Sequence, residues 1–310
     1  MNKEKVLVSG GAGFIGSNLV DSLIDLGYQV VVVDSLVSGK KEYINSQAKF
    51  YQIDILSNEL EDVFIKEKPD FVFHLAAQIE VSKSMKDPLK DAEINLRGGY
   101  NILDNCRKYL VKKIIFSSTG GAIYGESEII PTPESYSTNP LSFYGIHKLS
   151  FEKYLKCYNN EYGLDYGILR FSNVYGPRQF KGGEAGVIAI FIDNAVNNNS
   201  SIQYGDGSQT RDFVYVDDVV RALISCLKND CRQEINISHG QEYSLKEIEK
   251  SIEKALGREI DIVEKEAKPG EQLRSCLDNS LAKKILNWEP EIGLEEGIKR
   301  TINWAKNNKQ

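Results

Sequence analysis

The sequence predicts an α/β protein with a doubly wound parallel sheet and a smaller α/β lobe toward the C-terminus. Two observations support this fold class. Short apolar runs such as "KVLVS" and "QVVVVD" alternate with helix-length segments in the first half of the chain. Uninterrupted Val, Ile and Phe runs fit strands covered on both faces, and strand–helix alternation is typical of βαβ units. In addition, a glycine-rich turn joins the first apolar run to the first helical segment.

The elements follow in a regular order. We expect strands at residues 5–9, 29–34, 71–76, 113–118 and 166–171, and helices at 15–27 and 95–110. Beyond residue 176 the alternation loosens, although "SLKEIEKSIEKALG" has the N-cap serine and terminal glycine of a helix. Residues 281–309 are helical apart from a turn at Pro290. We therefore expect a first domain over residues 1–175, to which the chain returns near 212–240, and a second over 176–310.

Composition restricts the class of protein. The chain has 310 residues, of which 41% are hydrophobic, and its net charge of −6 argues against nucleic acid or an anionic membrane as partner. Five scattered cysteines form no CxxC, so we expect reduced thiols, and three histidines suggest no metal site. The N-terminus enters a strand at once and no apolar run could span a bilayer. We expect a cytoplasmic protein.

The turn after the first strand has the features of a phosphate-binding loop. "SGGAGFIGSNLV" places Gly10, Gly13 and Gly16 between a strand and a helix. Glycines there permit a tight turn and a close approach of backbone N–H groups to a pyrophosphate at the helix N-terminus. The next strand ends at Asp34, about 20 residues further on, where a carboxylate accepts the ribose hydroxyls of NAD and repels a 2′-phosphate. NAD is the expected cofactor, with Asp54 beside the adenine.

Tyr144 stands four residues before Lys148 at the start of an apolar-striped segment. On a helix such residues share a face. The pair is either packing plus a solvated charge or a catalytic base with its lysine, because a neighbouring ammonium lowers the pKa of a phenol. "KIIFSST" brings Ser118 and Thr119 to a strand end, where they would face the cofactor.

Several longer motifs extend this pattern over the whole chain: "GGAGFIGS", "HLAA", "SSTGGAIYG", "YGIHK", "LRFSNVYGPRQ", "RDFVYVDDVV" and "PGE". With these motifs the chain resembles the extended short-chain dehydrogenase/reductase superfamily, within it the NAD-dependent epimerase/dehydratase family, and most of all the UDP-glucose 4-epimerases. The resemblance implies a Rossmann-type NAD-binding domain followed by a nucleotide-sugar lobe. It implies 4-epimerisation of UDP-glucose and UDP-galactose through a 4-keto sugar, with tightly bound NAD⁺ that is not consumed.

The resemblance assigns residues by motif position. Thr119, Tyr144 and Lys148 would be catalytic, with Ser118 as the alternative to Thr119. The implied cofactor contacts are Gly10, Gly13, Phe14, Ile15, Asp34, Ser38, Gly39, Asp54, Ile55, Leu75, Ala76, Ala77, Asn95, Tyr144 and Lys148. The implied substrate contacts are Ser118, Thr119, Asn173, Gly186, Val187, Tyr204, Arg211, Lys268, Glu271, Arg274 and Ser275.

The chain departs from its relatives near the "PGE" turn. The usual arginine is Lys268 here, so Lys268 or Arg274 would replace it on the diphosphate. Ser275 falls where such epimerases place a wall beside the sugar, and a small residue there can admit a 2-acetamido group. The resemblance therefore extends the expected substrates to UDP-GlcNAc and UDP-GalNAc.

Three other functions compete with this interpretation. A UDP-glucuronate 4-epimerase would use the same Tyr144 and Lys148. A sugar-nucleotide dehydratase or decarboxylase needs further acid–base groups, and a dehydratase has an Asp–Glu pair where this chain has Gly120 and Gly121. A non-catalytic NAD-sensing regulator typically loses the Tyr/Lys pair, which is present here. The resemblance also implies a homodimer, for whose interface Phe143, Ile146, Leu149 and Leu155 are candidates.

Overall fold

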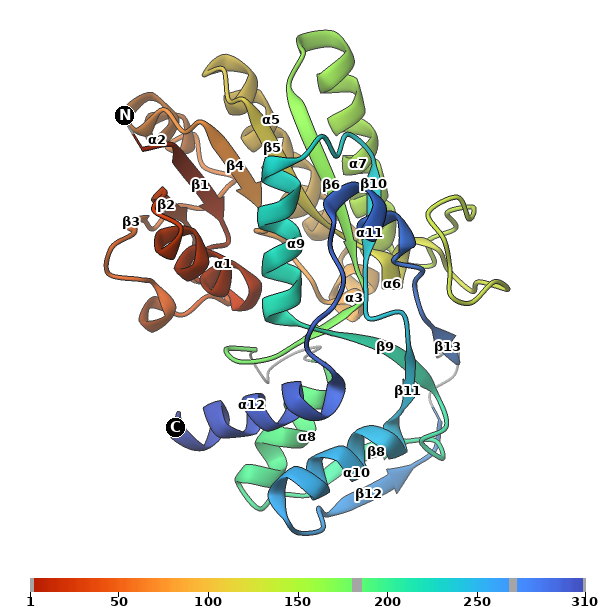
Figure 1. The fold of residues 1–310 in the computed structure, drawn as a ribbon. Coiled ribbons are helices and arrows are strands. Elements are labelled where there is room, and N and C mark those ends of the chain that lie inside the picture. Colours follow the sequence, from red (N-terminus) through yellow and green to blue (C-terminus); the bar gives the residue numbers. More distant parts are fainter. Residues whose placement is uncertain (1–2, 180–185, 268–271, 309–310) are drawn as a thin grey trace.

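A computed structural model describes residues 3–179, 186–267 and 272–308. Its centre is a sheet of seven parallel strands in the order β10-β6-β5-β4-β1-β2-β3 (Figure 1). The strands are β1 Lys5–Ser9, β2 Gln29–Val33, β3 Lys49–Tyr51, β4 Phe71–His74, β5 Lys113–Thr119, β6 Asp165–Phe171 and β10 Glu234–Ile237. The order reverses between β1 and β4, which creates the crevice where doubly wound sheets bind ligands. The expected fold class is confirmed.

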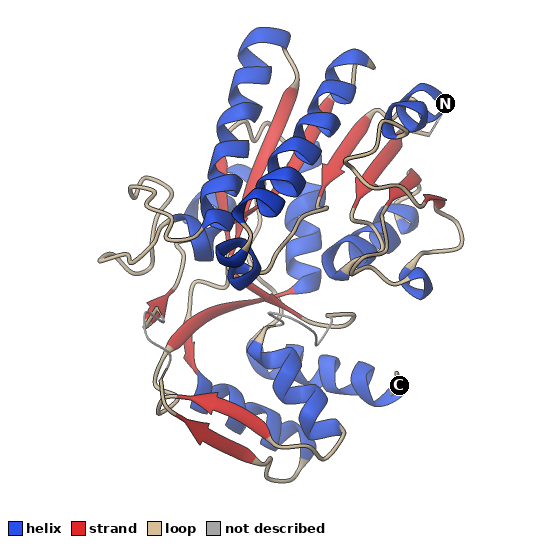
Figure 2. Cartoon of the chain, turned by 180° about the vertical axis from the view of Figure 1, so that it is seen from behind, coloured by secondary structure: helices blue, strands red, loops and turns tan. Residues whose placement is uncertain are grey.

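Helices cover both faces of this sheet (Figure 2). One face carries α1 Phe14–Asp25, α9 Val216–Lys228 and α11 Ser280–Leu286; the other carries α2 Leu60–Glu67, α5 Gly99–Lys108 and α7 Phe143–Tyr162. Side chains from neighbouring positions of one strand enter different cores: Val6 and Val8 pack toward α1, and Leu7 packs toward the opposite layer. Burial on both faces explains why these strands are continuous apolar runs.

A smaller lobe lies beyond the carboxyl ends of the strands (Figure 1). Its four-stranded sheet contains β7 Asn173–Tyr175, β9 Thr210–Tyr215, β11 Glu242–Ser244 and β13 Arg274–Ser275. A two-stranded sheet pairs β8 Ser201–Tyr204 with β12 Ile262–Lys265, and the helices are α8 Val187–Val196, α10 Leu245–Leu256 and α12 Leu294–Asn307. Between β9 and β11 the chain returns to the large sheet, where β10 pairs in parallel with β6.

Local sequence signals set the ends of the long helices. Ser142 caps α7, since its hydroxyl accepts from Gly145 N at 3.1 Å, and Gly163 ends the helix at a left-handed φ of 73°. Helix α10 begins with a capping box between Ser244 and Glu247 and ends before Gly257, as its sequence predicts. Short elements complete the chain: η1 Lys41–Tyr43, α3 Val81–Lys86, α4 Pro88–Ala92, the π-helix η2 Glu93–Gly98 and α6 Gly120–Ile123.

One expectation about the cysteines is wrong. Cys226 near the end of α9 and Cys231 in the following loop form a disulfide, with 5.9 Å between their Cα atoms. A helix end that turns back toward the next strand brings positions five residues apart within disulfide range. Cys106, Cys157 and Cys276 are free thiols, as expected. In the described part of the chain no helix is long and apolar enough to cross a bilayer.

Candidate active site

The loop between β1 and α1 is shaped so that only glycine fits at two positions. Gly10 has a left-handed φ of 75°, and a Cβ on it would lie 2.7 Å from Ala76 N in the neighbouring loop. A Cβ on Gly16 would lie 2.0 Å from Gly10 O, so α1 can approach the turn only with glycine there. Gly13 is the N-cap of α1, whose first N–H groups are left for an anion. This loop fits the pyrophosphate of a dinucleotide.

Asp34 lies at the end of β2, beside this loop, and is buried. Its Oδ2 accepts from Ala12 N at 2.9 Å and its Oδ1 from Leu36 N at 2.8 Å. A carboxylate offers about four acceptor positions, so Asp34 can still accept ribose hydroxyls. Gly39 closes over it, since a Cβ there would lie 2.7 Å from Asp34 Oδ1. The structure thus brings Asp34 together with Gly39, which lies in the same loop as Ser38.

The other predicted cofactor residues line the same edge of the sheet. Asp54 is exposed and its Oδ1 accepts from Leu56 N at 2.9 Å, while Ile55 is buried. Leu75, Ala76 and Ala77 follow β4 and are partly buried. Asn95 holds this loop through both its amide atoms, because Oδ1 accepts from Gln78 N and Nδ2 donates to Gln78 O, each at 3.0 Å. Asn95 therefore supports the loop that follows β4, and its contact with the cofactor stays a prediction.

Tyr144 and Lys148 lie one turn apart at the start of α7. Lys148 Nζ donates to Ser117 O at 2.9 Å and lies 5.9 Å from the centre of the Tyr144 ring. The lysine is buried, and burial lowers its pKa to about 8. The backbone N–H of Tyr144 donates to Ser84 Oγ at 3.1 Å, which fixes the first turn of α7 against α3. Tyr144 and Lys148 therefore share one face of α7, as expected.

The structure separates the two neighbouring hydroxyls at the end of β5. Ser118 is buried and its Oγ donates to Glu152 Oε1 at 2.6 Å. Glu152 also receives both ends of the Arg170 guanidinium, at 2.9 Å and 2.6 Å. Thr119 is the last residue of β5 and is only partly buried. Ser118 is thus committed to a buried cluster, whereas Thr119 remains at the carboxyl edge of the sheet.

Sequence reasoning missed several buried polar groups around this site. His74 Nδ1 lies 2.8 Å from Ser9 Oγ, and burial, then the charge of Lys148, lowers the pKa of His74 to about 3. Asp91 Oδ2 lies 2.5 Å from His147 Nδ1. Both histidines lie within motifs, "FVFHLA" and "YGIHK", which could have marked them as part of the site. Their partners, Ser9 and Asp91, are distant in sequence and could not be identified from it.

Arg211 lies on β9 in the second lobe. The register of β11 and β13 against β9 determines which residues lie beside Arg211. Ser275 of β13 and Tyr243 of β11 are the direct neighbours of Arg211. Arg274 is the neighbour of Thr210 and therefore points to the other face, where its guanidinium pairs with Glu242. The structure brings Ser275 to Arg211 and places Arg274 away from it. Lys268 and Glu271 lie outside the described residues.

Asp212 links β9 to three segments that are distant from it in sequence. It is fully buried and accepts from His239 N at 2.9 Å, Gly240 N at 3.1 Å and Leu277 N at 3.3 Å, while burial raises its pKa. Its backbone carbonyl accepts from Asn173 Nδ2 at 3.2 Å. The remaining candidates are partly buried: Gly186 and Val187 begin α8, and Tyr204 ends β8.

Comparison with known proteins identifies the family. The model of the NAD dependent epimerase/dehydratase family matches residues 6–238. The chain belongs to this family. The expected family and its cofactor, NAD, are therefore confirmed, and the Gly10 turn and Asp34 fit that cofactor. Among the described residues no group of three or more His, Cys, Asp or Glu could hold a metal ion.

Three solved structures resemble this one over nearly their full length. A UDP-glucose 4-epimerase from Thermotoga maritima with UDP-glucose has a TM-score of 0.96 and 45% identity, covering 99% of this chain and 100% of that chain. One from Thermus thermophilus in complex with NAD has a TM-score of 0.93 and 38% identity, covering 98% and 99%. A UDP-N-acetylglucosamine 4-epimerase from Methanobrevibacter ruminantium M1, in complex with UDP-N-acetylmuramic acid, has a TM-score of 0.92 and 36% identity. The match covers 98% of this chain and 98% of that chain.

Proposed function

We propose that this protein is a UDP-glucose 4-epimerase that retains NAD⁺. The observation that carries the proposal is the arrangement of Tyr144 and Lys148 on one turn of α7, next to a strand end with one uncommitted hydroxyl, Thr119. Similarity to epimerases over the whole chain supports it. In this proposal the residues up to about 175 bind NAD, with the returning segment near 212–240, and the later residues bind the nucleotide sugar.

Each residue of the site has its own role in the proposed epimerisation. When bound, NAD⁺ would supply the acceptor for the hydride of C4 and, once reduced, the donor for its return to the opposite face of the sugar. Tyr144 removes the proton of the 4-hydroxyl, through Thr119 or directly, and gives it back once the 4-keto sugar has turned about its bond to the diphosphate. The ammonium of Lys148 favours the phenolate. Arg211 and Asn173 bind the diphosphate and sugar.

The neighbours of Thr119 argue against a dehydratase. Gly120 and Gly121 follow it directly, and neither side chain can transfer a proton. A Cβ on Gly120 would meet Leu277 Cδ1 at 2.2 Å, so this position is filled by packing. Oxidation and reduction at C4 need no further acid or base, which fits a 4-epimerase.

We further propose that the sugar pocket admits a 2-acetamido group. Ser275 is small, and its pairing with Arg211, the proposed diphosphate ligand, supports a position near the sugar. A UDP-glucuronate substrate remains the second candidate, because the base and lysine would serve it equally.

The function is tested with purified protein and no added NAD. UDP-galactose, UDP-GalNAc and UDP-glucuronate are supplied separately, and NMR or chromatography follows their 4-epimers. Conversion of UDP-galactose supports the proposal, and conversion of UDP-GalNAc supports the open pocket. If UDP-galactose is not converted even after NAD⁺ is added, the UDP-glucose assignment is wrong.

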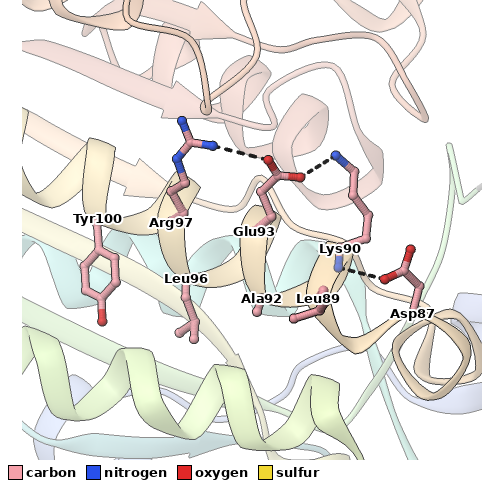
Figure 3. A pocket seen from close by; sticks show the side chains of 8 residues that line it. All are labelled: Asp87, Leu89, Lys90, Ala92, Glu93, Leu96, Arg97 and Tyr100. Atoms are coloured by element: carbon pink, nitrogen blue, oxygen red, sulfur yellow. Dashed lines mark hydrogen bonds and ion pairs between the residues drawn. The ribbon is translucent and has the colours of Figure 1, made fainter.

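We also propose a homodimer formed through α7 and the helices beside it. Leu89 on α4 is 82% exposed and Ile146 on α7 is 43% exposed, with Phe143 and Tyr154 also exposed. Leu155, by contrast, belongs to the monomer core, and Leu149 is partly buried. A shallow pocket lies on this face, where Leu96 and Tyr100 point away from the ion pairs of Glu93 (Figure 3).

Light scattering tests this interface. Ile146→Asp should convert a dimer to a monomer, because a carboxylate would be buried against apolar side chains. Leu110→Asp is the matched control, since Leu110 is 86% exposed and follows α5 in the loop before β5. A wild-type monomer, or a dimer that persists in Ile146→Asp, would contradict the interface. A cytoplasmic location stays a prediction.

A further inference from the structure

Lys148 is a buried cation without a direct ionic partner. The residue is only 4% exposed. Its Nζ donates to the carbonyl of Ser117 and lies 4.7 Å from the centre of the Phe116 ring. Over the described ranges of the chain, no carboxylate lies within ion-pair distance of Nζ. Burial of an ammonium favours its neutral form unless a negative charge lies nearby. The site therefore needs a counter-charge at longer range.

Two buried acids lie close to this turn of α7. Asp91 of α4 has its Oδ2 2.5 Å from Nδ1 of His147, the residue before Lys148, and Glu152 follows Lys148 by one turn of α7. Glu152 is already neutralised, because Arg170 of β6 binds both its oxygens at 2.9 Å and 2.6 Å. From β4, His74 faces the same region, but its lowered pKa of about 3 keeps it neutral. Neither Glu152 with its arginine nor His74 can therefore supply a net negative charge.

Asp91 has a different set of partners. It is 1% exposed, and Gln78 Nε2 donates to its Oδ1 at 2.6 Å while His147 Nδ1 lies 2.5 Å from its Oδ2. An amide and an imidazole satisfy the hydrogen bonds of a carboxylate, but neither carries a fixed positive charge as a guanidinium does. His147 is also the residue directly before Lys148, so its bond to Asp91 holds this turn of α7 against α4.

We propose that Asp91 is a positioning residue that acts through Lys148, supplying the negative charge that keeps this buried lysine an ammonium. Gln78 and His147 hold the carboxylate at the required place. The consequence for Tyr144 rests on the proposed function, whereas the electrostatic link between Asp91 and Lys148 does not.

The link is tested by titrating Lys148 directly. Protein labelled with ¹³Cε-lysine is followed by NMR against pH, and the Lys148 signal is assigned by its loss in Lys148→Met. In Asp91→Asn, which keeps the size of the side chain, the titration midpoint of Lys148 should fall by about one pH unit. The matched control is Glu161→Gln, which removes a charge from an exposed position near the other end of α7. There the midpoint should not move.

An unchanged or higher midpoint in Asp91→Asn overturns the inference, even if the variant is less stable, because a purely structural role would not move this titration. If Asp91→Asn does not fold, as judged by circular dichroism, Asp91→Ser removes the same charge with a smaller side chain and is judged by the same midpoint. The readout needs no substrate, so it separates this inference from the proposed function. If wild-type protein fails to convert UDP-galactose, only the proposed function fails.

Discussion

Ser118 donates its hydroxyl proton to Glu152 over 2.6 Å, and this bond sets it apart from Thr119, the next residue of β5. The sequence motif favours Thr119 as the catalytic hydroxyl and leaves Ser118 as the alternative. In the structure, one completes a buried ion pair between α7 and β6, and the other stands at the carboxyl edge of the sheet. Stability and catalysis should therefore depend on different members of the pair.

The first prediction separates them by substitution. Thr119→Ala should lower kcat for UDP-galactose by about 10²-fold, since it removes a proton-transfer group, and should leave the free energy of unfolding unchanged. Ser118→Ala should instead lower the free energy of unfolding by about 1–3 kcal/mol, because a buried carboxylate loses a donor. Steady-state kinetics and urea unfolding measure the two effects. The reverse pattern would make Ser118 the catalytic hydroxyl.

Removing the phenol of Tyr144 should remove the base. We expect Tyr144→Phe to lower kcat by about 10²- to 10⁴-fold, while the NAD released from denatured protein stays the same. Tyr162→Phe is the control, because Tyr162 is an exposed tyrosine at the other end of α7. Comparable activity in Tyr144→Phe and wild type would exclude Tyr144 as the base.

The lowered pKa of Lys148 predicts a loss of activity in mildly alkaline solution. Burial brings this pKa to about 8, so the ammonium is present below that pH and is lost as the pH rises through it. Since the ammonium favours the phenolate of Tyr144, kcat should fall above about pH 8. The pH profile of kcat is measured alongside the content of bound NAD at each pH. A flat profile between pH 7 and 9.5 would contradict the prediction.

His74 should make the fold sensitive to acid. Its pKa is lowered by burial to about 3, so the unfolded chain takes up a proton near its ordinary pKa of about 6.5 while the folded chain does not. Stability from His74 is therefore complete above that pH and declines as the pH falls, by at most about 1.4 kcal/mol per pH unit. Urea unfolding from pH 7 to 4.5 should show a shallower decline in His74→Gln. An identical decline would show that His74 is not responsible.

Asp34 should determine how tightly NAD is held. Loss of one charged hydrogen bond to the ribose costs about 1.5–3 kcal/mol, so Asp34→Asn should weaken NAD binding by roughly 10- to 100-fold. Isothermal titration of NAD into protein freed of cofactor measures this. Asp25→Asn serves as control, because Asp25 is exposed at the far end of α1. Equal affinity in both variants would remove Asp34 from the ribose site.

The parts of this molecule that local sequence determines were predictable. Continuous apolar runs indicated buried parallel strands, and Ser244 and Gly257 marked the ends of α10. The glycine turn and Asp34 indicated the dinucleotide because their chemistry follows from spacing along one strand, turn and helix. Tyr144 and Lys148 belong to the same group, since one helical turn joins them.

Contacts between distant segments were not predictable in this way. Asp91 and His147 are 56 residues apart, and Tyr124 meets Asn236 across 112 residues. Arg274 was a candidate for the diphosphate, but the register of β13 against β9 turns it toward Glu242. Nothing in the residues around Arg274 specifies that register, and a shift of one position would have reversed its face.

The return of the chain to the large sheet has a consequence for how the protein is made. Strand β10 covers the outer edge of β6, and α9 supplies Val219 and Leu223 to the core beneath the sheet. During synthesis on the ribosome, the sheet therefore cannot close until about residue 240 has emerged. A fragment ending near residue 175 would display the bare edge of β6 and an uncovered apolar layer, so we expect it to aggregate rather than fold. We therefore expect the two lobes to fold as a single unit.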